Sequence, residues 1–154
     1  MPSPELSADL PLRCHFRLRS MRLPQDVPRP ILDETRIHPA IRENVAELHA
    51  GIVREVQQAV TENDVVVVGM RHNPHVRRAR RALDAAGISH RYLEYGSYAS
   101  QWRRRNALKM WTGWPTFPMV FVRGVLVGGA SDVVRLIAGN EFAGLLTKRS
   151  TKED

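Results

Sequence analysis

The segment VVVVGMRHNPHVRRAR, residues 65–80, constrains the fold most strongly. Its four consecutive valines, bounded by Gly69, are typical of a strand buried on both faces, because β-branched residues favour strands and the run is too short for a helix. Asn73 then supplies a helix N-cap residue and Pro74 a proline at the first helical position. Gly87 is typical of a helix C-terminus. The segment therefore predicts a strand, a short polar loop and a helix.

The remainder of the C-terminal half alternates strand and helix signals. A strand, a helix and a second strand in this order imply a right-handed crossover and parallel pairing. A basic helix rich in tryptophan follows, then a hairpin that turns at Arg123-Gly124, and a last helix that begins near Ser131. These signals predict a small four-stranded mixed sheet with helices on its faces. The expected ranges are 65–68 and 90–95 for the first two strands, 74–86 and 100–111 for the helices, and 119–122 and 125–127 for the hairpin.

The N-terminal part of the chain has a different pattern. Residues 1–40 contain seven of the ten prolines and show little periodicity, so we expect an irregular extension. From 41 to 60, apolar residues recur every three or four positions, which predicts one amphipathic helix of about five turns. We expect a domain over 41–146, with this extra helix at 41–60 and a core at 64–146, and a polar tail at 147–154. The apolar stripe of the extra helix is Ile41, Val45, Leu48, Ile52, Val56 and Val60.

Composition excludes some classes of protein and leaves others open. In 154 residues no apolar run reaches the roughly 18 residues of a membrane span, and no secretory signal is recognisable, so we expect a cytoplasmic protein without membrane contact. The net charge of +7 is concentrated between 64 and 123, and such a surface attracts nucleic acid, anionic ligands or acidic partners. Trp102 and its neighbouring arginines suit base stacking, but their helical spacing favours a half-buried face and disfavours nucleic acid. The oligomeric state is not indicated.

Three motifs resemble those of the glutaredoxins, a branch of the thioredoxin-like fold. WPTFP at 114–118 resembles a segment of the monothiol glutaredoxins, and GGASD at 128–132 is similar to the family's glycine-rich loop. RNALK at 105–109 is similar to the basic helix that precedes WPT. The resemblance covers roughly residues 64–146. It implies an α/β, thioredoxin-like four-stranded mixed sheet flanked by helices, here with an extra N-terminal helix, and a family activity of glutathione-dependent thiol–disulfide exchange.

The chain departs from this family at the position of the catalytic cysteine. Glutaredoxins begin a C-P-x-C or C-G-F-S motif there, whereas Asn73 occupies the position here, followed by Pro74, His75 and Val76. A helix N-terminus stabilises a thiolate and lowers its pKa, but asparagine supplies only a neutral acceptor. Cys14, the single cysteine, lies far upstream. We therefore predict no catalytic residue, and an iron–sulfur cluster is disfavoured.

The resemblance implies that the glutathione-binding groove is retained. Phe117, before a cis Pro118, would offer its backbone to the cysteinyl part of glutathione. Residues of the GGASD loop would receive the γ-glutamyl end, although they would cap the last helix with or without a ligand, and basic residues would face the glycine carboxylate. His72 and His75 lack a third ligand, so no metal site is predicted. The expected ligand-binding residues are Arg71, Arg105, Lys109, Thr116, Phe117, Pro118, Ser131 and Asp132.

These observations favour recognition of glutathione, or of an extended thiol-containing peptide or protein, without thiol–disulfide catalysis. Two alternatives remain open. The first is a redox or iron–sulfur role through the thiols of a partner or through Cys14. The second is a basic protein-interaction module that uses the helix at 100–111.

Overall fold

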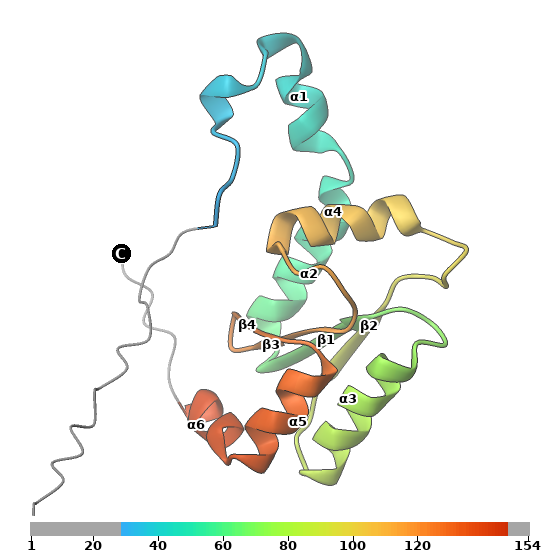
Figure 1. The fold of residues 1–154 in the computed structure, drawn as a ribbon, viewed down its shortest axis with the longest axis vertical. Helices are drawn as coiled ribbons and strands as arrows, with labels where there is room; N and C mark the ends of the chain where they lie inside the picture. The colour runs from blue at the N-terminus through green and yellow to red at the C-terminus, as the bar shows by residue number, and fades with distance from the viewer. Residues whose placement is uncertain (1–28, 148–154) are drawn as a thin grey trace, which may run out of the picture. The chain divides into compact units, whose positions relative to one another are not determined.

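The computed structural model describes residues 29–147, and the chain divides into two units, Met1–Ile37 and His38–Asp154. The described part of the first unit contains a single 3-10 turn, Glu34–Arg36, whose N-terminus is capped by the side chain of Asp33. The second unit contains the sheet and the α-helices (Figure 1). No helix within 29–147 is long and apolar enough to cross a bilayer.

The sheet contains four strands in the order β2-β1-β3-β4. β1 (Val65–Gly69) pairs in parallel with β2 (Arg91–Glu94) and antiparallel with β3 (Met119–Val122). β3 forms an antiparallel hairpin with β4 (Val125–Gly128). The predicted mixed sheet, its parallel crossover and its hairpin are confirmed.

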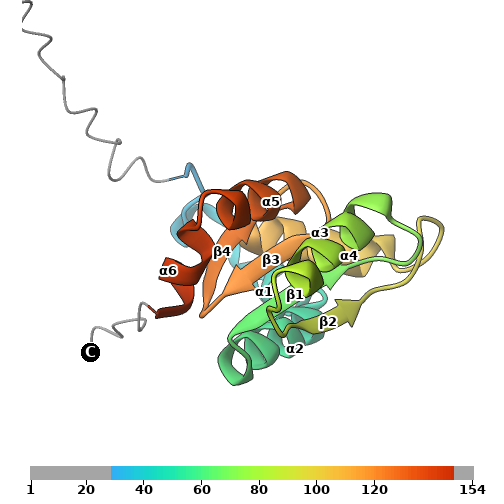
Figure 2. The same ribbon diagram turned by 90° about the horizontal axis from the view of Figure 1, so that it is seen from below.

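Helices cover both faces of the sheet. α2 and α4 lie on one face and α3 and α5 on the other, with α6 beside α5 (Figures 1 and 2). The predicted helices after β1, after β2 and after β4 are present, whereas the short α6 was not expected from the sequence. The helices are α1 (Pro39–Glu47), α2 (Ala50–Glu62), α3 (Pro74–Ala85), α4 (Trp102–Thr112), α5 (Ala130–Ala138) and α6 (Glu141–Thr147).

The four valines of β1 divide the interior into two cores. Val66 and Val68 belong to the core under α2 and α4, while Val65 and Val67 belong to the core under α3 and α5. This division follows from the strand geometry, since successive side chains point to opposite faces of a sheet. All four are buried, as expected for a central strand covered on both sides.

The predicted single helix over 41–60 is wrong, because the structure contains two helices there. The break lies at Leu48, which leaves helical geometry with ψ 104°, and at His49, which adopts a left-handed conformation with φ 55°. Ile52 and Val56, after the break, pack into the core beneath α2. The apolar residues before the break are exposed on α1, where no part of the sheet lies beneath them. A regular apolar spacing thus continues across a point where the backbone changes direction.

Substitution of Val67 by alanine tests the importance of the doubly buried strand. Removal of its two buried methyl groups should lower the free energy of unfolding by about 2 kcal/mol, since a cavity remains in a closely packed interior. Val125→Ala in β4 is the matched control, because Val125 is an exposed strand valine and should cost less than about 1 kcal/mol. Urea unfolding followed by circular dichroism measures both. Equal losses in the two variants would contradict this description of the core.

Candidate functional site

Asn73 caps the N-terminus of α3. Its side-chain Oδ1 accepts hydrogen bonds from the backbone N–H groups of His75, at 2.8 Å, and Val76, at 3.3 Å. Pro74 occupies the first turn, where no intrahelical N–H bond is lost. The Asn73 side chain is buried, so these two contacts replace the solvent that the amide groups would otherwise need. The predicted N-cap is confirmed. The group that accepts hydrogen bonds at the N-terminus of α3 is the neutral side-chain amide of Asn73.

Two adjoining cavities lie next to this cap. One has a volume of about 320 Å³ and extends along α4, and the other, of about 280 Å³, extends to the start of α5. Because His75, Thr116 and Phe117 line both, we treat them as one groove and call it the Pro118 groove. Its further lining residues are Met70, Asn73, Tyr98, Trp102, Arg105, Asn106, Lys109 and Pro115 on the α4 side, and Trp114, Pro118, Gly129, Ala130, Ser131 and Asp132 on the α5 side.

The segment before β3 forms the floor of the groove. The Phe117-Pro118 peptide bond is cis, as the resemblance implied. Within 29–147 neither the backbone N–H nor the C=O of Phe117 forms a hydrogen bond, although its side chain is buried. Lys109 of α4 lies above this residue, with its Nζ 5.8 Å from the centre of the phenyl ring. Phe117 therefore brings to the lining of the groove a main-chain donor and a main-chain acceptor that have no partner within residues 29–147.

The α5 end of the groove is organised around Asp132. Its Oδ2 accepts a hydrogen bond from the backbone N–H of Gly129 at 3.0 Å, and its Oδ1 accepts one from Nη2 of Arg135 at 3.0 Å. Ser131 is exposed beside it. Gly128 adopts φ 114°, and a Cβ atom there would come within 2.5 Å of the Asp132 carboxylate. The carboxylate thus has a structural role as a helix cap at the same place where it borders the groove.

Arg105, at the α4 end, is committed to the loop that precedes α4. Its Nη1 donates to the backbone C=O of Tyr95, at 2.9 Å, and to that of Ser100. The side chain is buried, and burial lowers the pKa of its guanidinium. The group remains charged at neutral pH, because an arginine titrates far above that range. Lys109, which is less buried and has no such bonds to the loop, is the more available cation at this end.

Arg71 does not line the groove. Its Nε donates to Oε1 of Glu94 on β2 at 3.0 Å, and the side chain is largely exposed. The structure brings the other expected residues together. Among the lining residues that were not expected are His75 and Trp114, whose positions beside Pro74 and within WPTFP were their only signals in the sequence. The expected residues that line the groove are Arg105, Lys109, Thr116, Phe117, Pro118, Ser131 and Asp132.

Residues 29–147 contain no group of three or more His, Cys, Asp or Glu side chains that could hold a metal ion. His72 is separated from His75 by the turn at the start of α3 and adopts φ 62°. Cys14 lies outside the described residues.

The sequence matches glutaredoxin proteins. A family model described as glutaredoxin matches residues 65–127. A glutaredoxin-like protein of Dictyostelium discoideum is 48% identical over 87 residues, which cover 56% of this chain and 71% of that protein. The chloroplastic glutaredoxin-C4 of Oryza sativa subsp. japonica is 29% identical over 94 residues, which cover 61% of this chain and 71% of that protein.

Solved structures show the same arrangement of strands and helices. Oxidized glutaredoxin 2 from Chlamydomonas reinhardtii superposes with a TM-score of 0.55 at 29% identity, over 64% of this chain and 92% of that one. A buckwheat glutaredoxin, crystallised as a complex with glutathione, superposes with a TM-score of 0.57 at 24% identity, over 66% and 92%. The predicted thioredoxin-like fold with its four-stranded mixed sheet is confirmed.

Replacing Asn73 by alanine tests the cap. The variant leaves two amides at the start of α3 without their acceptor, so the free energy of unfolding should fall by about 1 to 2 kcal/mol. Asn73→Ser is the matched control, because a serine side chain retains an oxygen that caps a helix and should recover most of the loss. Thermal and urea unfolding measure both variants. An alanine variant as stable as the parent would show that the cap contributes nothing.

Proposed function

We propose that this chain, which belongs to the glutaredoxin family, binds glutathione or an extended thiol-containing peptide in the Pro118 groove without performing thiol–disulfide exchange itself. One observation supports this most strongly. Phe117, whose backbone N–H and C=O have no hydrogen-bond partner within residues 29–147, lines the groove between a cation, Lys109, and a carboxylate, Asp132. Glutathione is an extended tripeptide with carboxylates at both ends and an ammonium group at one of them.

The floor of the groove suits the main chain of such a ligand. An extended peptide beside Phe117 would accept from its N–H and donate to its C=O, in the way that a strand is added to a sheet edge. The backbone contact fixes direction and register, while the surrounding side chains determine which peptide fits. Phe117 and Trp114 supply apolar surface along this path.

Charges at the two ends of the groove match the ends of glutathione. Lys109 would attract the glycine carboxylate, and the N-terminus of α5 near Ser131 offers backbone amides to the carboxylate of the γ-glutamyl end. Asp132 would receive the ammonium group beside that carboxylate. Since one oxygen of Asp132 already pairs with Arg135, the ligand would share this carboxylate with the arginine.

The same site is unsuited to thiol chemistry. Attack on a disulfide needs a thiolate, and the amides that would stabilise one at the start of α3 are occupied by the amide oxygen of Asn73. An iron–sulfur cluster does not fit either, because its ligands are thiolates and Asn73 is not one. We therefore propose a binding protein that retains the recognition surface of an oxidoreductase family.

Calorimetric titration with reduced glutathione tests binding and its orientation. Asp132→Asn keeps an oxygen that caps Gly129 but removes the charge, so affinity should fall about fivefold, the size expected for a partly exposed ion pair. Asp84→Asn on α3, outside the lining of the groove, is the matched control and should bind as the parent does. If the parent protein does not bind reduced glutathione, the glutathione part of the proposal is refuted.

A new thiol at residue 73 tests whether the groove still presents glutathione correctly. In a Cys14→Ser background, Asn73→Cys should react with glutathione disulfide: the thiolate attacks one sulfur, a protein–glutathione disulfide forms, and one glutathione thiolate leaves. Mass spectrometry measures the adduct. The control is Arg77→Cys in the same background, an exposed position on α3 that should react slowly. Equal rates at both positions would mean that the groove does not orient the ligand.

Cys14→Ser alone should leave glutathione binding unchanged, and a loss of binding would favour a role for that thiol.

A further inference from the structure

The side-chain amide of Asn73 is paired at its oxygen and unpaired at its nitrogen. Its Oδ1 accepts from the backbone N–H groups of His75 and Val76. These two bonds identify the oxygen of the amide, since a backbone N–H can donate only to that atom. The Nδ2 group forms no hydrogen bond within residues 29–147. The helix therefore holds the amide in one orientation, and the N–H groups of Nδ2 are left without an acceptor.

The Nδ2 group opens into the Pro118 groove. Asn73 is only 7% exposed. The side-chain nitrogen and oxygen atoms of 29–147 that are both enclosed and unpartnered are Nε of Arg80, Oη of Tyr95 and Nε1 of Trp114. Nδ2 of Asn73 also has no partner but is not one of these atoms, so it is not enclosed. The cavity that Asn73 lines is the α4 side of the groove, and the donor is available there.

The backbone of the first turn of α3 offers no further donor to a ligand. Pro74 has no N–H. The N–H groups of His75 and Val76 donate to Oδ1 of Asn73, and that of Arg77 donates to the backbone C=O of the same residue. Hydrogen bonds in series polarise one another, so the two amides make Nδ2 of the same side chain a stronger donor. The positive end of the helix thus acts on a ligand through Asn73.

The surroundings of this donor favour an anion. Of the described residues that line the α4 side of the groove, Arg105 and Lys109 are cations and none is a carboxylate. Asp132 lines the α5 side, where it pairs with Arg135. Hydrogen bonds to a charged acceptor are about twice as strong as those between neutral groups. A negatively charged acceptor beside Asn73 would gain such a bond and the attraction of both cations.

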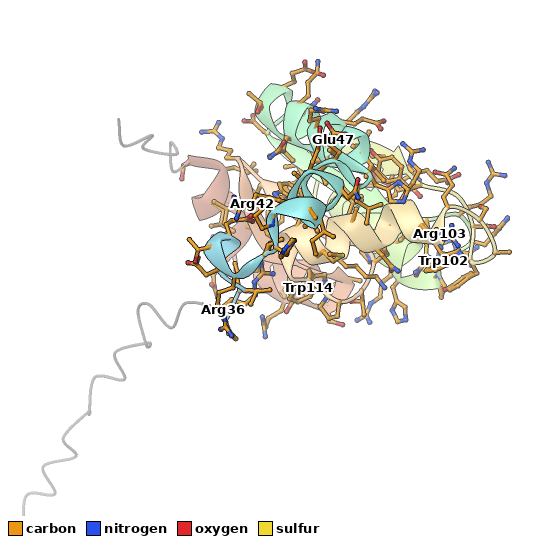
Figure 3. The ribbon with its side chains drawn as sticks, turned by 90° about the horizontal axis from the view of Figure 1, so that it is seen from above. Arg36, Arg42, Glu47, Trp102, Arg103 and Trp114 are labelled. Carbon is orange, nitrogen blue, oxygen red and sulfur yellow. The ribbon has the colours of Figure 1, made fainter. Side chains whose placement is uncertain are left out.

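The donor lies at the place that the cysteinyl residue of a ligand would take. Figure 3 shows Trp102 at the beginning of α4 and Trp114 beyond its end, and these residues line the two sides of the groove. His75 and Phe117 line both sides and therefore mark its middle. A cysteinyl residue that pairs with the backbone of Phe117 would lie there, with its sulfur beside the start of α3, where Asn73 is.

We infer that Asn73 is a ligand-binding residue whose Nδ2 group donates to the sulfur end of the bound cysteinyl residue, and that the groove prefers glutathione sulfonate to reduced glutathione. This preference rests on the proposed function, since it specifies the ligand of the same groove. A thiol sulfur is a weak acceptor and is uncharged while protonated. A sulfonate carries a negative charge and oxygen acceptors at the same position. It therefore supplies the acceptor that Nδ2 lacks.

Calorimetric titration of the full chain with reduced glutathione and with glutathione sulfonate tests this preference. The parent protein should bind the sulfonate at least about tenfold more tightly, the size of one hydrogen bond to a charged group. Asn73→Asp keeps an oxygen that caps α3 and replaces Nδ2 by a second oxygen, so the preference should disappear. Its stability to urea should stay about that of the parent, because aspartate and asparagine cap helices equally well. A residue that served only as a cap would leave the preference unchanged.

Arg77→Glu separates a contact at residue 73 from a general effect of charge. It changes the charge near the start of α3 more than Asn73→Asp does, but Arg77 is exposed and does not line the groove, so the preference should persist. If the parent binds reduced glutathione and binds the sulfonate no more tightly, the preference is refuted and the proposed function stands. A preference that survives in Asn73→Asp, or that Arg77→Glu abolishes equally, also overturns the role of Asn73. If neither compound binds the parent, this role and the glutathione part of the proposed function fail together.

Discussion

The burial of β1 on both faces is the constraint on which the rest of the structure depends. Its valines alternate between two cores, so β1 must lie in the middle of the sheet, with helices above and below it. A central strand needs partners on both sides, which β2 and β3 provide. β1 leads at its C-terminal end into the loop and cap of α3. Pro118 directly precedes Met119 of β3, which pairs with Val68 near that same end of β1. The candidate site is therefore a consequence of where the valine strand ends.

The sequence was sufficient for the sheet and its flanking helices, because their signals are local and agree with one another. Four valines, an Asn-Pro cap and the hairpin turn at Arg123-Gly124 each favour one conformation. The segment 41–60 shows what apolar periodicity cannot predict. The spacing indicates which residues share a helix face, but it does not indicate whether the helix is continuous. The break falls at Leu48 and His49, neither of which is a proline or a glycine, so the backbone angles show a break that the apolar spacing does not.

The location of the candidate site could be predicted from the sequence, but the hydrogen bonds and ion pairs of its individual side chains could not. Seven of the eight expected residues line the Pro118 groove, since sequence motifs record which segments meet. Arg71 pairs with Glu94, and Arg105 is held by two backbone carbonyls, because each found a closer partner within the fold. A basic residue that belongs to a binding motif is thus not always free to bind an anion. Of the three basic residues expected in the groove, Lys109 is the one that remains available.

The cap at Asn73 links the fold to the proposed function. A helix N-terminus stabilises whatever accepts its amides, and the fold needs only an acceptor there, whether or not that group is reactive. Asparagine meets the structural need, while in the groove beside it the backbone N–H and C=O of Phe117 have no partner among residues 29–147. The proposed ligand binding would use the backbone of Phe117, whereas thiol chemistry would need a thiolate at position 73. The first can therefore be kept when the second is lost.

The central claim is that a ligand pairs with the backbone of Phe117 in the Pro118 groove. A titration of isotopically labelled protein with reduced glutathione, followed by amide nitrogen–proton NMR, tests it at single-residue resolution. The Phe117 amide should show the largest shift, and this shift should saturate, with smaller shifts at Ser131 and Asp132 and none in α6. Shifts confined to other surfaces, or no shift at Phe117 under saturating glutathione, would contradict it.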